Sequence, residues 1–153
     1  MTADPGLTER ERRAWQGFLR MQSEVLARLA RHLHQESGLS GSDYEVLVNL
    51  SEAPEGRLRA FEIGAATQWE KSRLSHHLTR MAQRGLVERQ PCTDDSRYAN
   101  IVLTEAGRAA IAGAAPLHAA HVRELFLDAL TPAQLDALAE IAGAMLTHLE
   151  QQA

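Results

Sequence analysis

The residues of this chain best suited to chemistry lie between Glu70 and Arg89, in the run EKSRLSHHLTRMAQRGLVER. Leu74, Leu78 and Met81 recur at helical spacing, so one narrow apolar stripe can be buried. At about 100° per residue, the opposite face carries only hydrogen-bonding groups and no acid. Its members are Ser72, Arg73, His76, Thr79 and Arg80, with Ser75 and His77 on its flanks. Such a face suits phosphate oxygens and base edges in a DNA major groove, although an ordinary solvated helix face can have the same composition.

The segments around this helix predict a winged helix-turn-helix. Gly85 ends the helix as a left-handed cap residue. Leu86–Gln90 and Ile101–Leu103 then predict two short strands joined by a polar loop, which is the pattern of a β-hairpin. In front of the helix, residues 61–67 predict a short helix, and Thr67-Gln68-Trp69 gives the tight turn of a helix-turn-helix. Leu58 can add a one-rung strand to the hairpin.

The residues from Leu58 to Gly107 resemble the multiple-antibiotic-resistance regulator (MarR) family of bacterial transcription factors. The resemblance is carried by WEKSRLSHHL, RMAQRGLVER, DDSR and VLTEAG, in that order and spacing. It implies a mainly α fold with a small antiparallel β-hairpin wing, in which a winged helix-turn-helix lobe sits on a helical dimerisation scaffold. It also implies a homodimer that binds a pseudo-palindromic double-stranded DNA operator, most often as a repressor.

The resemblance extends the expected DNA-binding residues to the wing. Asp95 and Arg97 stand where the family carries an Asp and an Arg at the wing tip, and the family's arginine enters the minor groove while its aspartate orients it. A narrow minor groove concentrates negative potential and favours arginine. A surface ion pair without effect on DNA affinity is the alternative. Ser96 departs from the basic residue common in the family, so the wing contact is expected to be weaker here.

Three further basic residues leave two interpretations open. Lys71, Arg84 and Arg89 can contact DNA phosphates or hold the lobe together. We count Arg89 among the expected DNA-binding residues.

The family resemblance implies a small-molecule effector, commonly an aromatic or phenolic anion, between the lobe and the dimer helices. Trp15, His32 and Tyr44 are candidate lining residues because each combines an apolar body with a polar tip. Each of them fits an ordinary core position equally well.

No internal repeat or low-complexity linker divides the chain, and the resemblance implies a single MarR-type domain over residues 1–153. Thr8 with Glu11, Ser42 with Glu45, and Thr131 with Gln134 predict three helix starts. We expect the lobe at residues 42–103 and a helical dimerisation region at residues 7–37 and 104–151. The first helix is too long for a small lobe to cover alone.

The distribution of charge along the chain supports a nucleic-acid partner better than the net charge does. The 153 residues carry a net charge of −4, but residues 57–101 hold eight basic and five acidic residues. That window is +3, which leaves −7 for the remainder. With 44% hydrophobic residues, no long apolar run and a polar N-terminus, the chain is expected to be a folded cytoplasmic protein without a membrane segment.

No sequence signature supports catalysis or a cofactor. P-loop, nucleophile-elbow, HExxH and dinucleotide-binding motifs are absent. Cys92 is the single cysteine, and it fits a small semi-buried residue better than a redox sensor. The histidine pairs His32/His34 and His118/His121 lack the carboxylate-rich spacing of a metal site, so a zinc-responsive regulator is the weaker alternative. A winged-helix module that docks protein instead of DNA would need exposed Leu, Phe or Trp on the Glu70–Arg89 helix, where polar residues stand.

Overall fold

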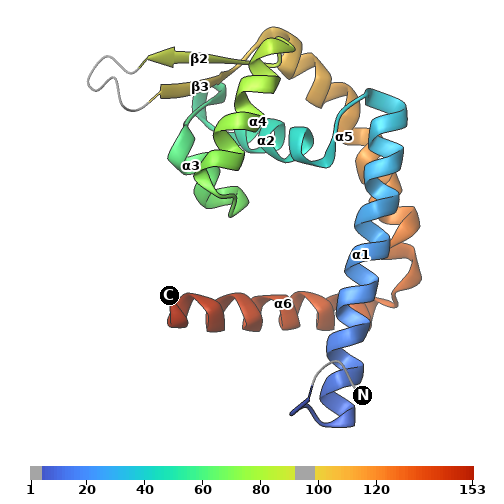
Figure 1. The fold of residues 1–153 in the computed structure, drawn as a ribbon. Coiled ribbons are helices and arrows are strands. Elements are labelled where there is room, and N and C mark those ends of the chain that lie inside the picture. The colour runs from blue at the N-terminus through green and yellow to red at the C-terminus, as the bar shows by residue number, and fades with distance from the viewer. Residues whose placement is uncertain (1–4, 92–98) are drawn as a thin grey trace. The chain divides into compact units, whose positions relative to one another are not determined.

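The computed structural model describes residues 5–91 and 99–153, and it is mainly helical with one small antiparallel sheet, as predicted (Figure 1). The described helices are α1 (Glu9–Ser37), α2 (Gly41–Glu52), α3 (Ala60–Thr67), α4 (Lys71–Gln83), α5 (Glu105–Leu125) and α6 (Pro132–Gln152), with the 3₁₀ turns η1 (Pro54–Gly56) and η2 (Leu127–Ala129). The strands are β1 (Arg57–Arg59), β2 (Val87–Pro91) and β3 (Ala99–Leu103). The chain divides into two compact units. Residues 30–118 contain the winged helix-turn-helix segment expected at residues 42–103, and this whole unit is called the lobe from here on; residues 1–29 with 119–153 are called the terminal unit.

Two of the three predicted capping boxes are confirmed. The Thr8 backbone N–H donates to Glu11 Oε2 at 2.8 Å, and the same reciprocal pattern joins Thr131 and Gln134 at the start of α6. The predicted box of Ser42 and Glu45 is wrong, because α2 is capped by Ser40. Asp43 supplies the reciprocal carboxylate there, and its burial in the lobe fixes the helix start two residues earlier.

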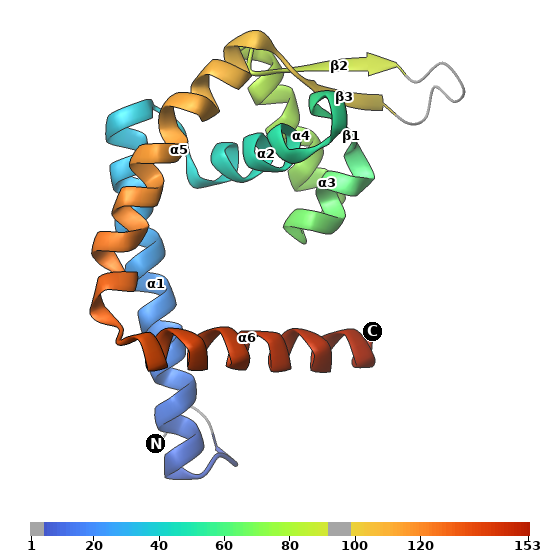
Figure 2. The ribbon, with the colours of Figure 1, turned by 180° about the vertical axis from the view of Figure 1, so that it is seen from behind.

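The sheet forms the predicted wing and is completed by β1. Its strand order is β1-β3-β2, with both pairs antiparallel. Ile101 of β3 pairs with Leu58 on one side and Arg89 on the other. The one-rung strand expected at Leu58 is therefore a three-residue strand. Figures 1 and 2 show β2 and β3 running side by side away from the helices of the lobe.

One hydrophobic core fixes α4 within the lobe. The stripe predicted on α4, Leu74, Leu78 and Met81, is buried. It packs into a cluster with apolar side chains from α2, α3, β3 and α5, among them Val46, Leu47, Leu50, Ile63, Ile101, Leu103 and Ile111. Because α4 is held by several elements at once, its orientation in the lobe is determined by packing more than by its own helix propensity.

The terminal unit is organised differently, since its large apolar side chains are mostly on the surface. On α6 no residue is buried, and Leu135, Ile141, Met145, Leu146 and Leu149 are all exposed. On α1, Trp15, Phe18, Leu19 and Leu26 are exposed as well. Among the described residues, no helix is both long and apolar enough to cross a membrane.

The junction between α4, β2 and α5 depends on a close backbone approach. Gly85 has φ +76° and ends α4, as predicted. The Thr104 hydroxyl donates to the Gly85 carbonyl at 2.6 Å and accepts from the Gly107 N–H at 3.0 Å, which caps the start of α5. A Cβ at Gly107 would lie 2.1 Å from the Leu86 carbonyl oxygen. Only glycine therefore fits at position 107, in the first turn of α5.

Replacing Gly107 by Ala should lower the free energy of unfolding by about 2 kcal/mol or more, because the new methyl group would clash with backbone atoms of Leu86 that cannot easily move aside. Gly113→Ala is the matched control in the same helix, since a Cβ there meets nothing within 4 Å. The control should stabilise the protein by up to about 1 kcal/mol through helix propensity. Urea unfolding followed by circular dichroism measures both. Equal stability of the two variants would show that this close approach is absent.

Candidate nucleic-acid interface

Helix α4 presents the predicted polar face to the outside. Ser72, Arg73, Ser75, His76, Thr79 and Arg80 are exposed, and no acidic residue lies among them. His77 differs from the expectation, because it is only 8% exposed and belongs to the buried side. The outer face is therefore one residue narrower than the sequence indicated, and it is entirely polar or basic.

The guanidinium of Arg73 is held against an aromatic ring. Its central carbon lies 4.4 Å from the centroid of the Trp69 ring, which is a cation–π arrangement, and Nη2 donates to the Ser42 hydroxyl at 3.4 Å. The i, i+4 spacing of Trp69 and Arg73 was available in the sequence, but Trp69 precedes α4 in the turn. Arg73 thus extends from the lobe with its direction restricted from two sides.

A buried carboxylate joins α2 to α4, and sequence reasoning missed it. Asp43 is 2% exposed. Its Oδ2 accepts from Arg84 Nη1 at 2.7 Å and from the Ser40 backbone N–H at 2.9 Å, while its Oδ1 lies 3.0 Å from His77 Nε2. We call these four residues the Asp43 junction. No local pattern predicts it, because Arg84 is 41 positions from Asp43.

The charge state of Asp43 follows from these contacts. Burial works to raise the pKa of Asp43, but the hydrogen bonds from Arg84 and the Ser40 amide outweigh it and hold the pKa below its ordinary value. The lobe therefore contains the ionised carboxylate. Its contribution to stability is complete above the ordinary aspartate pKa and is lost as the pH falls through the lowered value.

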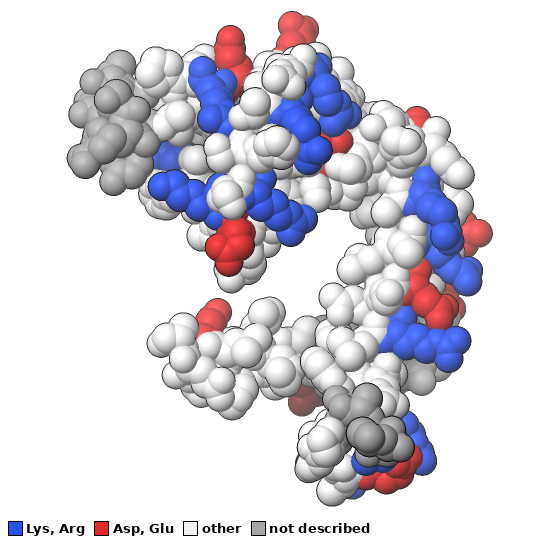
Figure 3. Space-filling view, in the orientation of Figure 1, with Lys and Arg blue, Asp and Glu red and all other residues white. Residues whose placement is uncertain are grey.

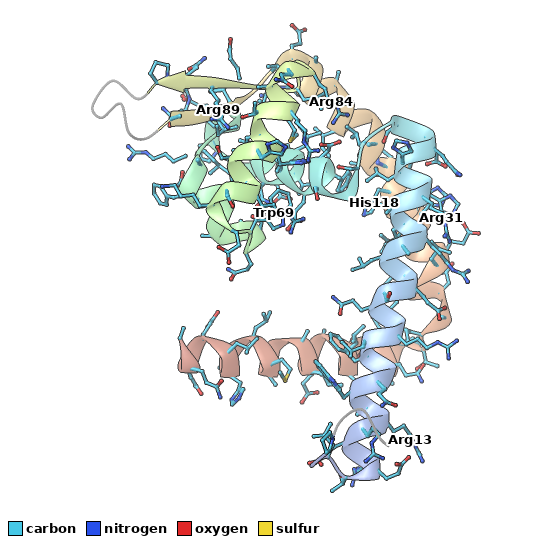
Figure 4. The ribbon with its side chains drawn as sticks, viewed as in Figure 1. Arg13, Arg31, Trp69, Arg84, Arg89 and His118 are labelled. Atoms are coloured by element: carbon cyan, nitrogen blue, oxygen red, sulfur yellow. The ribbon has the colours of Figure 1, made fainter. Side chains whose placement is uncertain are left out.

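Arg84 and Arg89 hold the lobe together in different places. Arg84, at the C-terminal end of α4, pairs with Asp43 and also donates to the Gly38 carbonyl. Arg89 of β2 donates to the Ser75 carbonyl at 2.8 Å and to the Thr79 hydroxyl at 3.1 Å, which ties the wing to α4. Figure 4 shows Arg89 beside the wing and Arg84 at the C-terminal end of α4. Arg89 remains exposed and keeps guanidinium N–H groups for another acceptor.

A pocket of about 430 Å³ lies beside the first turns of α4. Its walls are largely apolar and include Trp69, Leu74, Leu78 and Ile101, while the cations Arg59, Lys71 and Arg89 also line it. Figure 3 shows Lys and Arg side chains spread over the face of the lobe that carries α4, with few acids between them. This surface can attract and hold phosphate oxygens.

The remaining expected site residues are placed as follows. Asp95, Arg97 and Cys92 lie outside the described residues. Of the candidate effector-lining residues, Tyr44 is partly buried in the lobe, and the centroid of its ring lies 4.3 Å from the centroid of the His118 ring. His32 is also partly buried in the lobe, whereas Trp15 is 47% exposed in the terminal unit.

Comparisons with known proteins agree with this arrangement. A model of the MarR family matches residues 37–97. AbsC, a MarR family transcriptional regulator from Streptomyces coelicolor, is 38% identical, with 97% of this chain and 99% of that chain covered and a TM-score of 0.89. Sco3205 from the same organism, a MarR family regulator solved in complex with DNA, is 33% identical over 94% and 93% of the two chains, with a TM-score of 0.88.

A third similar structure is an organohalide-sensing transcriptional regulator in its 2,4-dichlorophenol-bound form. It is 16% identical and covers 97% of this chain and 89% of its own, with a TM-score of 0.81, so it shows likeness of fold alone. No curated protein matches the chain. The family model and the two Streptomyces regulators together show that this chain belongs to the MarR family of transcriptional regulators.

Proposed function

We propose that the protein is a homodimeric, sequence-specific regulator of transcription that represses its target genes and is released from DNA by a small-molecule effector. Members of its family are DNA-binding transcriptional regulators and not enzymes. The observation that carries the proposal is the outer face of α4, with Arg73 and Arg80 exposed, no acid among its side chains, and a buried stripe behind it.

The polar and basic residues of α4 and its surroundings are expected to contact different parts of the DNA. Arg73, His76 and Arg80 are the residues we propose to reach base edges, with Ser72, Ser75 and Thr79 in support. Lys71, Arg89 and Arg59 surround the pocket and are suited to backbone phosphates. At the wing tip, Arg97 with Asp95 is proposed for the minor groove on the strength of the family resemblance.

Twofold symmetry then predicts the form of the operator. Two copies of α4 related by a dimer axis would enter successive major grooves about one helical turn apart, so the site should be a pseudo-palindrome. A protein-docking module is disfavoured, because no large apolar residue of α4 is exposed.

Binding to duplex DNA should fall steeply with salt and should prefer promoter DNA of the protein's own gene over random duplexes. Alanine at Arg73, Arg80 or Arg97 should each weaken binding by about tenfold or more and, because each removes a cation from the DNA surface, should reduce the salt slope by up to about 1. Fluorescence anisotropy over a salt series measures both quantities.

The matched control is Arg13→Ala, which removes an exposed arginine of α1 in the terminal unit (Figure 4). It should bind DNA like the wild type. Weak binding with no salt dependence in every variant would contradict the DNA assignment. Unchanged affinity and slope in Arg97→Ala would contradict the wing assignment alone.

The exposed apolar residues of α1 and α6 support a homodimer as the functional state. Ile141 and Leu146 are 60% and 61% exposed in the single chain, which is unusual for aliphatic residues grouped on one helix. Sedimentation velocity should give twice the mass of one chain. The variant Ile141→Glu with Leu146→Glu should sediment as a monomer, whereas Glu140→Gln, at an exposed polar position of α6, should not change the mass. A wild type that remains monomeric at micromolar concentration would overturn the proposal.

A small aromatic anion is the proposed effector, with Trp15, His32 and Tyr44 as candidate contacts. The Tyr44 hydroxyl is protonated at neutral pH like that of any tyrosine, and burial, with a smaller effect from Glu52, raises its pKa further, so it can donate to an anion. Calorimetry with a panel of phenols and benzoates should show heat of binding for at least one compound, and that compound should lower DNA affinity. Tyr44→Phe should weaken its binding. If no compound gives heat and none releases DNA, this part of the proposal fails.

A further inference from the structure

The side chain of Arg80 meets a histidine that can only accept its hydrogen bond. Arg80 Nη2 lies 3.3 Å from Nδ1 of His77. A guanidinium has donors and no acceptor, so Nδ1 must be the unprotonated nitrogen of a neutral imidazole. The ring proton is therefore on Nε2. The exposed arginine is held by a side chain that is itself buried in the lobe.

The opposite side of the imidazole depends on Asp43. His77 Nε2 and Asp43 Oδ1 lie 3.0 Å apart, within ion-pair distance, and among the described residues neither atom makes a hydrogen bond of standard geometry, so each is the nearest polar partner that the other has. The other oxygen of the carboxylate is fixed by Arg84 and by the Ser40 N–H. A carboxylate held in this way selects the Nε2–H form of the histidine and orients its ring.

His77 also supports the second basic residue of the outer face. Its ring meets Trp69 edge to face, with centroids 5.4 Å apart and an interplanar angle of 84°. The Trp69 ring in turn carries the guanidinium of Arg73. Figure 4 shows Trp69 before the first turn of α4 and Arg84 near its other end, so the contacts span the helix.

We propose that Asp43 and His77 are positioning residues for DNA binding: the buried pair holds the guanidinium of Arg80, and through Trp69 that of Arg73, in the direction in which α4 presents them. This inference rests on the proposed function, in which the two arginines contact DNA. Neither residue of the pair touches DNA on this account.

The charges around His77 make the arrangement dependent on pH. Burial lowers the pKa of His77; Asp43, facing it from α2, works to raise it, and Arg80 and Arg73 of α4 add to the lowering. Arg84 reaches the far oxygen of Asp43. With the pKa below the ordinary histidine value, the ring is neutral at pH 7. Its contribution to stability is complete above the ordinary pKa and is lost as the pH falls toward the lowered one. Protonation would turn an N–H toward the Arg80 guanidinium.

The test is a double-mutant cycle on DNA affinity. His77→Phe keeps an aromatic ring beside Trp69 and removes the hydrogen bond to Arg80 and the polar contact with Asp43, and it should weaken binding by about tenfold at pH 7. If His77 acts through Arg80, the double variant His77→Phe with Arg80→Ala should bind no more weakly than Arg80→Ala alone. His77→Gln can donate to Asp43 and accept from Arg80, so it should retain most of the affinity. Urea unfolding of each variant confirms that the folded protein is being compared.

A pH series supplies a readout that a purely structural role would not affect. Wild-type affinity relative to His77→Gln should decline as the pH falls below the ordinary histidine pKa, because glutamine does not titrate. His34→Gln, at an exposed position of α1, is the control and should follow the wild type.

The outcomes separate this inference from the proposed function. If the wild type binds no DNA, or if Arg80→Ala binds as well as the wild type, the proposed function fails first. The positioning inference is overturned if Arg80→Ala weakens binding while His77→Phe does not. It is equally overturned if the fold-losses in DNA affinity of His77→Phe and Arg80→Ala multiply in the double variant. A ratio of wild-type to His77→Gln affinity that is independent of pH would overturn it as well.

Discussion

A single buried carboxylate connects the parts of the lobe that DNA recognition requires. Asp43 begins α2 by accepting from Ser40, faces His77 in the middle of α4, and pairs with Arg84 at the end of α4. A buried charge is expensive unless its hydrogen-bonding capacity is used, so the Asp43 junction favours one arrangement of the two helices over alternatives with the same apolar packing. The hydrophobic core packs α4 against the rest of the lobe, and the Asp43 junction helps to fix the orientation of the helix there.

Much of the lobe could be predicted because its signals are local. The stripe of Leu74, Leu78 and Met81 has helical period, Gly85 supplies a left-handed residue after it, and the alternating run from Leu86 gives a strand. Each of these features needs only a few neighbouring residues. The family resemblance then orders them into a winged helix-turn-helix, and the comparisons confirm that membership.

What could not be predicted depends on residues far apart in the chain. His77 was expected on the flank of the outer face, but Asp43 and Trp69 cover it. The start of α2 was placed at Ser42, because local spacing cannot tell which of two serines is joined to a buried aspartate. Arg89 is expected from the sequence to contact DNA or to hold the lobe together, and its bonds to Ser75 and Thr79 establish the second role, which no local spacing indicates.

The protonation state of His77 tests the junction most directly. Two-dimensional ¹⁵N–¹H spectra of histidine side chains, assigned with His77→Gln, distinguish the two neutral tautomers and the imidazolium. At pH 7 and without DNA, His77 should be neutral with its proton on Nε2, as the approach of Arg80 to Nδ1 and of Asp43 to Nε2 requires. A proton on Nδ1, or a charged ring at that pH, would contradict the arrangement on which the positioning of Arg80 depends.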